Sequence, residues 1–177
     1  MRKLFLLSVI FFLFTSCGIA GENRYINEEA GFSLIGPKGW YQKPGGQGQM
    51  TRYTATLLED FPVFSVIFED LSSRKEEVSL LTFAQEMVSD FQNSYKVHMV
   101  EVPTEFGANG TQGIKFVLDI ENVRRTTREA FLMRNFFYQF KKGKKIISIL
   151  AMAESGSSEK YRGAVEEAVK SFRWLEK

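Results

Sequence analysis

Apolar residues recur at helical spacing in two stretches of the chain. They run from Leu80 to Phe91 and from Tyr161 to Phe172, at intervals of three and four residues. Ser79 and Ser158 precede these stretches and are suitable N-cap residues. The spacing predicts two amphipathic helices, each with one apolar face that must pack against another layer.

The remaining apolar runs have strand character. The predicted strands are 25–28, 32–35, 50–58, 63–69, 95–102, 113–120, 129–140 and 144–152. The runs 131–140 and 145–152 are apolar at both sets of alternating positions, which is typical of central strands covered on both faces. Short turn segments such as Asn109–Gly110 favour antiparallel neighbours. The pattern predicts an α+β fold, with a single antiparallel-rich sheet of about 6–8 strands covered by helices.

Two segments carry a resemblance to a known family. The first reads Gly31-Phe32-Ser33-Leu34-Ile35-Gly36-Pro37-Lys38-Gly39-Trp40, and the second reads Ser171-Phe172-Arg173-Trp174. With the order of the predicted elements, they resemble the opening and the end of the PsbP/Mog1/DcrB-like domain over roughly residues 24–174. The resemblance implies an α/β/α sandwich. The family includes photosystem II extrinsic subunits, a Ran-binding nuclear protein and bacterial envelope lipoproteins, so the fold does not imply one function.

The first seventeen residues resemble an export signal. A basic start, Met1-Arg2-Lys3, is followed by an apolar run from Leu4 to Phe14 and then by Thr15-Ser16-Cys17. The apolar run is too short to span a membrane, which needs about 20 residues. The small residues before Cys17 resemble the lipobox of bacterial lipoproteins, although Phe14 stands where that motif usually has Leu.

The resemblance implies that Cys17 carries the lipid anchor. We expect residues 1–16 to be a lipoprotein signal peptide, 17–23 a lipidated tether, and 24–177 a single PsbP/Mog1-like domain. The alternative is cleavage after Ala20, which would discard Cys17. The expected location is the bacterial cell envelope, at the inner or outer membrane and mostly on the periplasmic side.

Composition and charge narrow the partner classes. A length of 177 residues fits one domain, and 23 basic against 21 acidic residues give a net charge of +2. Removing residues 1–16 takes away Arg2 and Lys3, which leaves 21 residues of each sign. A neutral mature chain gives no electrostatic reason to expect nucleic-acid binding.

Basic residues nevertheless gather at both ends of the strand predicted at 129–140. The first cluster is Arg124, Arg125 and Arg128, and the second is Lys141, Lys142, Lys144 and Lys145. At about 3.3 Å per residue, a strand of this length separates them into two patches some 35–50 Å apart. Either patch is a candidate contact for an envelope protein, an anionic lipid or a polymer. Ordinary solvated hairpin tips, with lysines that protect a sheet edge, are the alternative interpretation.

The sequence shows no catalytic constellation. One His and one Cys provide neither a metal shell nor a nucleophile with its base, so we expect no metal, no cofactor and no enzymatic activity. His98, in the predicted strand 95–102, is interpreted as an ordinary strand residue. The leading hypothesis is a lipid-anchored envelope protein with a binding or scaffold domain. The alternatives are a small-ligand or lipid carrier with a pocket between sheet and helix, and, ranked last, a hydrolase using His98.

Overall fold

The computed structural model of the protein describes residues 24–46, 48–59, 61–124 and 126–176. The strands are β1 (Arg24–Asn27), β2 (Phe32–Ile35), β3 (Tyr41–Pro44), β4 (Gln49–Thr54), β5 (Val63–Asp70), β6 (Val97–Ala108), β7 (Thr111–Val123), β8 (Ala130–Lys142), β9 (Lys145–Glu154) and β10 (Arg173–Trp174). The helices are α1 (Leu80–Ser94) and α2 (Glu159–Lys170), with short 3₁₀ turns η1 (Leu71–Ser73) and η2 (Ser155–Ser157).

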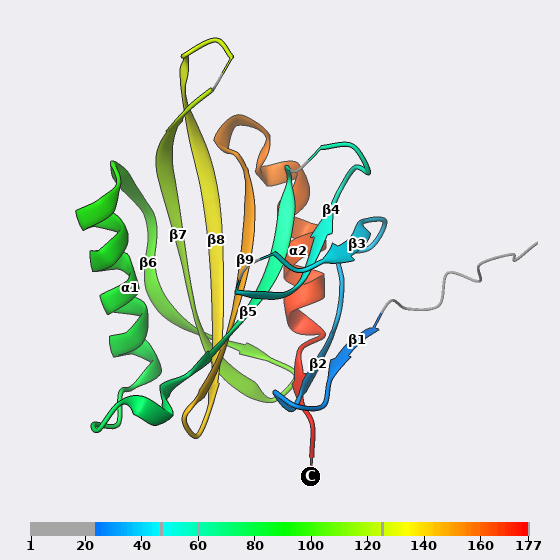
Figure 1. Ribbon diagram of the computed structural model, residues 1–177, viewed down its shortest axis with the longest axis vertical. Helices are drawn as coiled ribbons and strands as arrows, with labels where there is room; N and C mark the ends of the chain where they lie inside the picture. Colours follow the sequence, from blue (N-terminus) through cyan, green and yellow to red (C-terminus); the bar gives the residue numbers. More distant parts are fainter. Residues whose placement is uncertain (1–23, 47, 60, 125, 177) are drawn as a thin grey trace, which may run out of the picture.

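Two antiparallel sheets organise these elements. The larger sheet has seven strands in the order β3-β4-β5-β9-β8-β7-β6, and a small sheet has the order β1-β2-β10 (Figure 1). Asn109 and Gly110 have φ of 50° and 75°, as the tight turn between β6 and β7 requires. The predicted α+β class with a helix-covered antiparallel sheet is confirmed. The predicted strands 25–28 and 32–35 form an antiparallel hairpin in the small sheet. There β2 also pairs with β10, close to the end of the chain.

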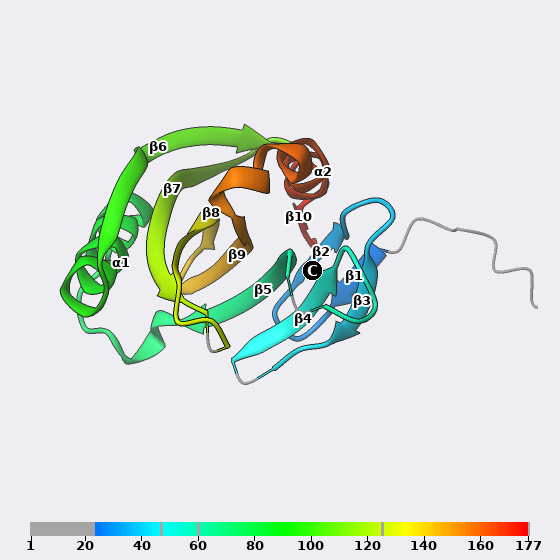
Figure 2. The same ribbon diagram turned by 90° about the horizontal axis from the view of Figure 1, so that it is seen from above.

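The helices lie on opposite faces of the large sheet. Seen from above, the sheet curves around α2 and the small sheet on its concave side, while α1 lies on the convex side (Figure 2). α1 contacts β6, β7 and β8, and α2 contacts β2, β6 and β9. This arrangement gives the apolar stripe of each helix its own sheet surface to cover.

Aromatic rings fill the core on the concave side. Phe172, just past the end of α2, stacks on Phe140 of β8 with ring centroids 4.0 Å apart. The centroid of the Phe32 ring of β2 lies 5.9 Å from that of Phe172. All three side chains are fully buried. A smaller core under α1 contains Phe116 and Phe137, stacked at 4.5 Å. Aromatic stacking thus joins the helices and the small sheet to the centre of the large sheet.

Strand β8 contributes to both cores, as its sequence predicts. Phe136, Tyr138 and Phe140 belong to the core on the α2 side, and Phe137 belongs to the core under α1. Its neighbour β9 is also buried along most of its length. The prediction that these two strands lie in the middle of a sheet covered on both faces is confirmed.

The helix starts differ in how they are capped. The Ser79 hydroxyl accepts a hydrogen bond from the Thr82 amide at 3.0 Å, so the predicted N-cap of α1 is confirmed. Ser158 precedes α2, but its hydroxyl donates to the Ser155 carbonyl at 2.9 Å and makes no cap bond. The preceding 3₁₀ turn takes that hydroxyl, and the predicted side-chain cap at Ser158 is therefore wrong.

Several strand limits also depart from the prediction. β3 was not predicted, because a short edge strand that ends in Pro44 lacks an alternating apolar pattern. β4 ends at Thr54 and not at residue 58, since the Thr54 hydroxyl donates to the Thr56 carbonyl and turns the chain. β6 continues beyond residue 102 to Ala108, because its pairing with β7 skips from Glu101 to Thr104 and leaves Pro103 out of the ladder.

Candidate interaction surface

Two connections, β4–β5 and β7–β8, lie at the same end of the large sheet (Figure 1). The antiparallel register fixes this placement. Val63 at the start of β5 pairs with Met152 near the end of β9, and Glu154 at that end pairs with Met133 near the start of β8. We call this end, with residues 55–59, 61, 121–124 and 126–132, the loop end of the sheet.

The β7–β8 hairpin projects beyond its neighbours at the loop end. β9 ends opposite Met133, and the pairing of β6 begins opposite Ile120. Among the described residues, no third strand therefore lies beside the pairs formed by 121–123 with 130–132. We call residues 121–132 the arginine hairpin. Val123 is 57% exposed on it. A two-stranded extension of this kind presents its side chains to solvent instead of to the core.

The arginines of the hairpin differ in their surroundings. Arg124 Nη2 lies 2.8 Å from Glu154 Oε1, and its guanidinium lies 4.7 Å from the centre of the Phe131 ring. This contact braces the hairpin against the end of β9. Arg128, with φ of 62°, is exposed at the turn and has no ion pair within the described residues. Arg125 lies outside the described residues.

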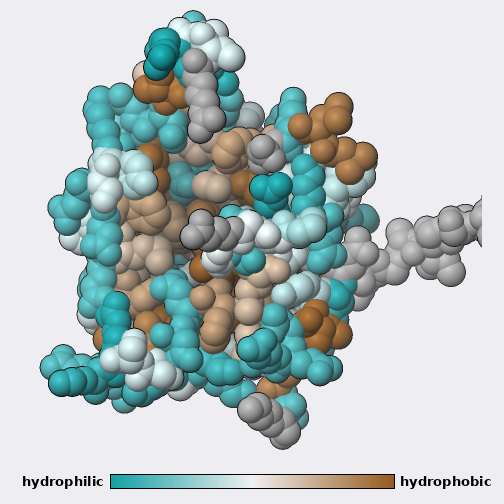
Figure 3. Space-filling model, viewed as in Figure 1, coloured by the Kyte–Doolittle hydropathy of each residue, from teal (hydrophilic) through white to brown (hydrophobic). Residues whose placement is uncertain are grey.

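The β4–β5 connection exposes apolar side chains. Leu57, Leu58 and Phe61 are 63%, 97% and 45% exposed. A turn holds them outward, because the Thr56 hydroxyl accepts a hydrogen bond from the Glu59 amide at 3.1 Å. Figure 3 shows apolar surface over this connection. Three exposed apolar side chains within five residues are unusual on a surface that contacts only solvent, and they make the loop end a candidate interaction surface.

The second predicted cluster lies at the opposite end of β8. Its four ammonium groups are held by different neighbours: Lys141 by the Glu77 carboxylate, and Lys142, Lys144 and Lys145 by the backbone carbonyls of Leu175, Arg74 and Glu29. Lys142 and Lys145 also lie over aromatic rings, at 6.0 and 5.8 Å from their centres. The two clusters occupy opposite ends of β8, and each lysine of the β8–β9 hairpin contacts a different neighbour.

A buried ion pair lies below the arginine hairpin on the concave side. Arg134 Nε and Nη2 each donate to an oxygen of the Asp119 carboxylate at 2.9 Å, and the Ser155 hydroxyl donates to the same carboxylate at 3.2 Å. The hydrogen bonds from Arg134 hold the pKa of Asp119 below its ordinary value, although burial acts in the opposite direction. Sequence reasoning did not predict this pair, because only strand register places the two residues side by side.

Arg162 extends this polar network along α2. Its guanidinium donates to Glu101 of β6 at 2.6 Å and to Glu166 of its own helix at 3.1 Å. Glu159, at the start of α2, accepts a hydrogen bond from Arg134 at 3.3 Å. The network ties α2 to three strands of the sheet. Each described charge in it has a partner, which favours a structural role.

His98 lies at the margin of this network. The register of β6, β7 and β8 places it opposite Asp119, which in turn lies opposite Arg134. The His98 side chain is exposed, and no hydrogen bond joins it to a hydroxyl or carboxylate of the described residues. The Asp119 carboxylate is already occupied by Arg134 and Ser155.

Comparison with solved structures places this architecture among known folds. The cyanobacterial PsbP protein of Synechocystis sp. PCC 6803 is 15% identical, with a TM-score of 0.57 over 92% of this chain and 99% of its own. The Ran-binding protein Mog1p of Saccharomyces cerevisiae is 12% identical, with a TM-score of 0.53 over 86% and 95%. LpqN, involved in cell envelope biogenesis of Mycobacterium tuberculosis, is 7% identical, with a TM-score of 0.55 over 82% and 83%.

The chain has a PsbP/Mog1-like fold. No model of a known protein family matches the sequence, and no curated protein matches it either. The segments that carried the resemblance are structural in this PsbP/Mog1-like fold. The Trp40 ring meets Tyr161 of α2 edge-on at 5.8 Å, and Phe172 lies in the main core. The structural likeness establishes the fold alone, because the sequence identities are all below 25%. The function must therefore be argued from the surface of this chain.

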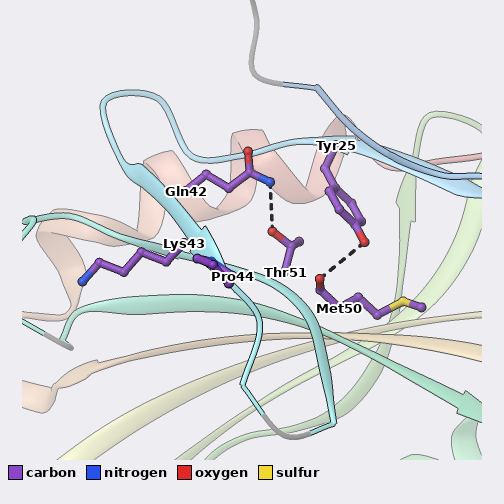
Figure 4. Close-up of a pocket in the computed structure, with 6 residues that line it drawn as sticks. All are labelled: Tyr25, Gln42, Lys43, Pro44, Met50 and Thr51. Carbon is purple, nitrogen blue, oxygen red and sulfur yellow. Dashed lines mark hydrogen bonds between the residues drawn. The ribbon is translucent and has the colours of Figure 1, made fainter.

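Among the pockets that the described residues form, two have linings that bear on ligand binding. One, of about 310 Å³, lies between β1 and the β3–β4 hairpin (Figure 4). Two hydrogen bonds span its lining: the Tyr25 hydroxyl donates to the Met50 carbonyl at 3.4 Å, and Gln42 Nε2 donates to the Thr51 hydroxyl at 3.1 Å. The other, of about 170 Å³, lies between α2 and the sheet.

Neither a metal site nor a membrane-spanning helix occurs within residues 24–46, 48–59, 61–124 and 126–176. No three His, Cys, Asp or Glu residues in these ranges are grouped so that they could hold a metal ion. None of the helices in this part of the chain is long and apolar enough to cross a membrane. Cys17, the predicted site of lipid attachment, lies outside the described residues.

Proposed function

We propose that this protein is an exported, lipid-anchored component of the bacterial cell envelope whose PsbP/Mog1-like domain binds an envelope partner without catalysis. Cys17 carries the anchor, and residues 17–23 tether the domain to the membrane. The sequence of residues 1–17 supports the export and the anchor. The fold shared with LpqN, involved in cell envelope biogenesis in its own organism, is consistent with this location.

The loop end supports the binding role. The arginine hairpin extends past the sheet with Arg128 exposed, and the β4–β5 connection presents Leu57, Leu58 and Phe61 at the same end. Neither feature is needed to complete the core. Exposed apolar side chains beside guanidinium groups are suited to a partner with an anionic and apolar surface, such as an acidic envelope protein or an anionic lipid or polymer.

The packing of the aromatic residues weakens the case for a lipid carrier. Cavities that enclose a drug-sized or larger ligand typically have volumes of about 300–1,000 Å³ and are lined mainly by apolar groups. The buried Phe residues of this chain stack on one another, and the pocket between α2 and the sheet is only about 170 Å³. A hydrolase would require His98 to activate a nucleophile, and no described hydroxyl accompanies its exposed ring.

The anchor is tested by the intact mass of the protein extracted from membranes, beside a Cys17→Ala variant. We expect an increment of two or three acyl chains that disappears in the variant. An anchored protein then fractionates with membranes, because each buried CH₂ contributes about 0.8 kcal/mol. A species that begins after Ala20 and carries no acyl chain would overturn the anchor.

The binding role is tested separately by crosslinking in intact cells. A photoreactive residue at position 58 or 128 should capture a discrete partner or envelope lipid. Arg128→Glu should reduce the yield of the crosslink from position 58. Lys144→Glu is the matched control, because it makes the same charge change at the opposite end of the sheet. Equal yields in both variants would contradict a role for the loop end.

A further inference from the structure

The pocket between α2 and the sheet has an unusual set of polar groups. Lys115 of β7 and Lys170 of α2 line it, and neither ammonium group has a hydrogen bond or carboxylate partner within the described residues. Lys96, by contrast, lies 2.7 Å from Glu121. Two cations without partners therefore line a single concave site.

The third polar group is the hydroxyl of Tyr138. Tyr138 of β8 is 5% exposed and lines the pocket, and its hydroxyl makes no hydrogen bond to another described residue. Burial, reinforced by the nearby charge of Glu166, raises the pKa of Tyr138. The hydroxyl thus stays protonated at neutral pH and can donate to a ligand. Glu166 also lines the pocket, and its carboxylate accepts a hydrogen bond from Arg162 Nε at 3.1 Å, which offsets part of its charge.

Apolar groups form the rest of the wall. The Phe106 ring meets Tyr138 edge-on at 5.6 Å, and Val169 of α2 lines the pocket from the helix side. Gly113 leaves space for the Phe106 ring because it has no side chain. A Cβ on Gly113 would lie 2.7 Å from a carbon of Phe106, so a larger residue would displace the wall. The pocket is therefore shaped by strand packing and is not a gap between loops.

We propose that this pocket binds a small organic carboxylate with a short apolar or aromatic body. The carboxylate lies between Lys115 and Lys170 and accepts a hydrogen bond from the Tyr138 hydroxyl, and the apolar body packs on Phe106 and Val169. The size agrees, because a cavity of about 150 Å³ can hold one benzene ring. This inference goes beyond the proposed envelope role and does not depend on the lipid anchor.

The competing pocket between β1 and the β3–β4 hairpin is less suited to such a ligand. It is larger, but the Tyr25 hydroxyl and the Gln42 amide already donate to other residues of the same pocket. Binding there would require these hydrogen bonds to be given up, whereas the two ammonium groups and the Tyr138 hydroxyl of the pocket at α2 are uncommitted within the described residues.

The test is a titration of the purified chain with benzoate, followed by NMR of backbone amides. We expect saturable shifts at residues of β7, β8 and α2 around the pocket, with a dissociation constant in the millimolar range. Benzamide, which has the same shape without the charge, should bind at least about tenfold more weakly, because charge-assisted hydrogen bonds are the stronger ones. Acetate should also bind more weakly, since it lacks the apolar body.

Three variants locate the site. Lys115→Met and Tyr138→Phe should each weaken benzoate binding by about fivefold or more, because each removes one donor and keeps the packing. Lys160→Met is the matched control on α2, since Lys160 lies outside the pocket lining, and it should leave binding unchanged. Equal affinity for benzoate and benzamide, shifts that map elsewhere, or no shift at about 50 mM benzoate would each overturn the proposal.

Discussion

The Arg134–Asp119 pair allows a quantitative test of how the network below the arginine hairpin stabilises the fold. The perturbation is Asp119→Leu, which removes the charge and replaces the carboxyl group with a somewhat larger apolar side chain. Removing one partner of a buried ion pair costs about 3–5 kcal/mol, because the other charge is left without compensation. Glu159 still lies 3.3 Å from Arg134, and the Arg134 side chain is 19% exposed, so we expect a loss of about 3 kcal/mol.

A double-mutant cycle separates the pair from its surroundings. Arg134→Met leaves the Asp119 carboxylate, 8% exposed, with only the Ser155 hydroxyl, and should cost about 3–4 kcal/mol. The variant with both substitutions should lose less than about 2 kcal/mol, because it buries no uncompensated charge. The assay is urea unfolding monitored by tryptophan fluorescence and circular dichroism. Each single variant should also lower the Tm by about 6–12 °C.

The pH dependence gives an independent check on the same pair. The pKa of Asp119 is lowered in the folded chain, so its contribution is fully present above the unfolded pKa of about 3.9 and disappears as pH falls through the folded value. The stability gap between wild type and Asp119→Leu should be constant near neutral pH and shrink below about pH 4. Single losses that add within about 0.5 kcal/mol, or a gap that persists in acid, would refute the reasoning.

Five further substitutions test the packing, the N-cap of α1 and the His98 side chain. Phe172→Ala should cost about 3–5 kcal/mol in urea unfolding, because it empties the centre of the aromatic stack. Gly113→Ala should cost at least about 2 kcal/mol, since the new Cβ would lie 2.6 Å from a backbone carbonyl of β8. Gly107→Ala is the control and should cost less, because its new Cβ would have no atom within 4 Å. Ser79→Ala should cost about 1 kcal/mol through the lost N-cap, and a result near zero would contradict that bond. His98→Gln should change stability by less than about 0.5 kcal/mol, and a larger loss would indicate an interaction of the imidazole that its exposure does not suggest.

Local patterns in the sequence determined most of the secondary structure. Period 3.6 at residues 80–91 and 161–172 predicted both helices, and the two-sided apolar runs predicted the central strands β8 and β9. These helices and strands were predicted correctly because a long element with a strong apolar face can bury that face in only one orientation against the rest of the fold. The same patterns failed at β3 and at the continuation of β6 past Pro103, because an edge strand is defined by its hydrogen-bond partner and not by its own residues.

Residues 1–17 predict export and a lipid anchor, and the sequence by itself places basic residues at both ends of β8. Only the tertiary structure decided what surrounds each charge. Lys141 and Lys145, close in sequence, reach the Glu77 carboxylate and the Glu29 backbone carbonyl. Asp119 and Arg134 meet because β7 and β8 pair in one register. The pocket at Lys115 likewise depends on three strands and α2 packing together. Such sites are set by long-range contacts, and the spacing of residues along a chain carries no information about them.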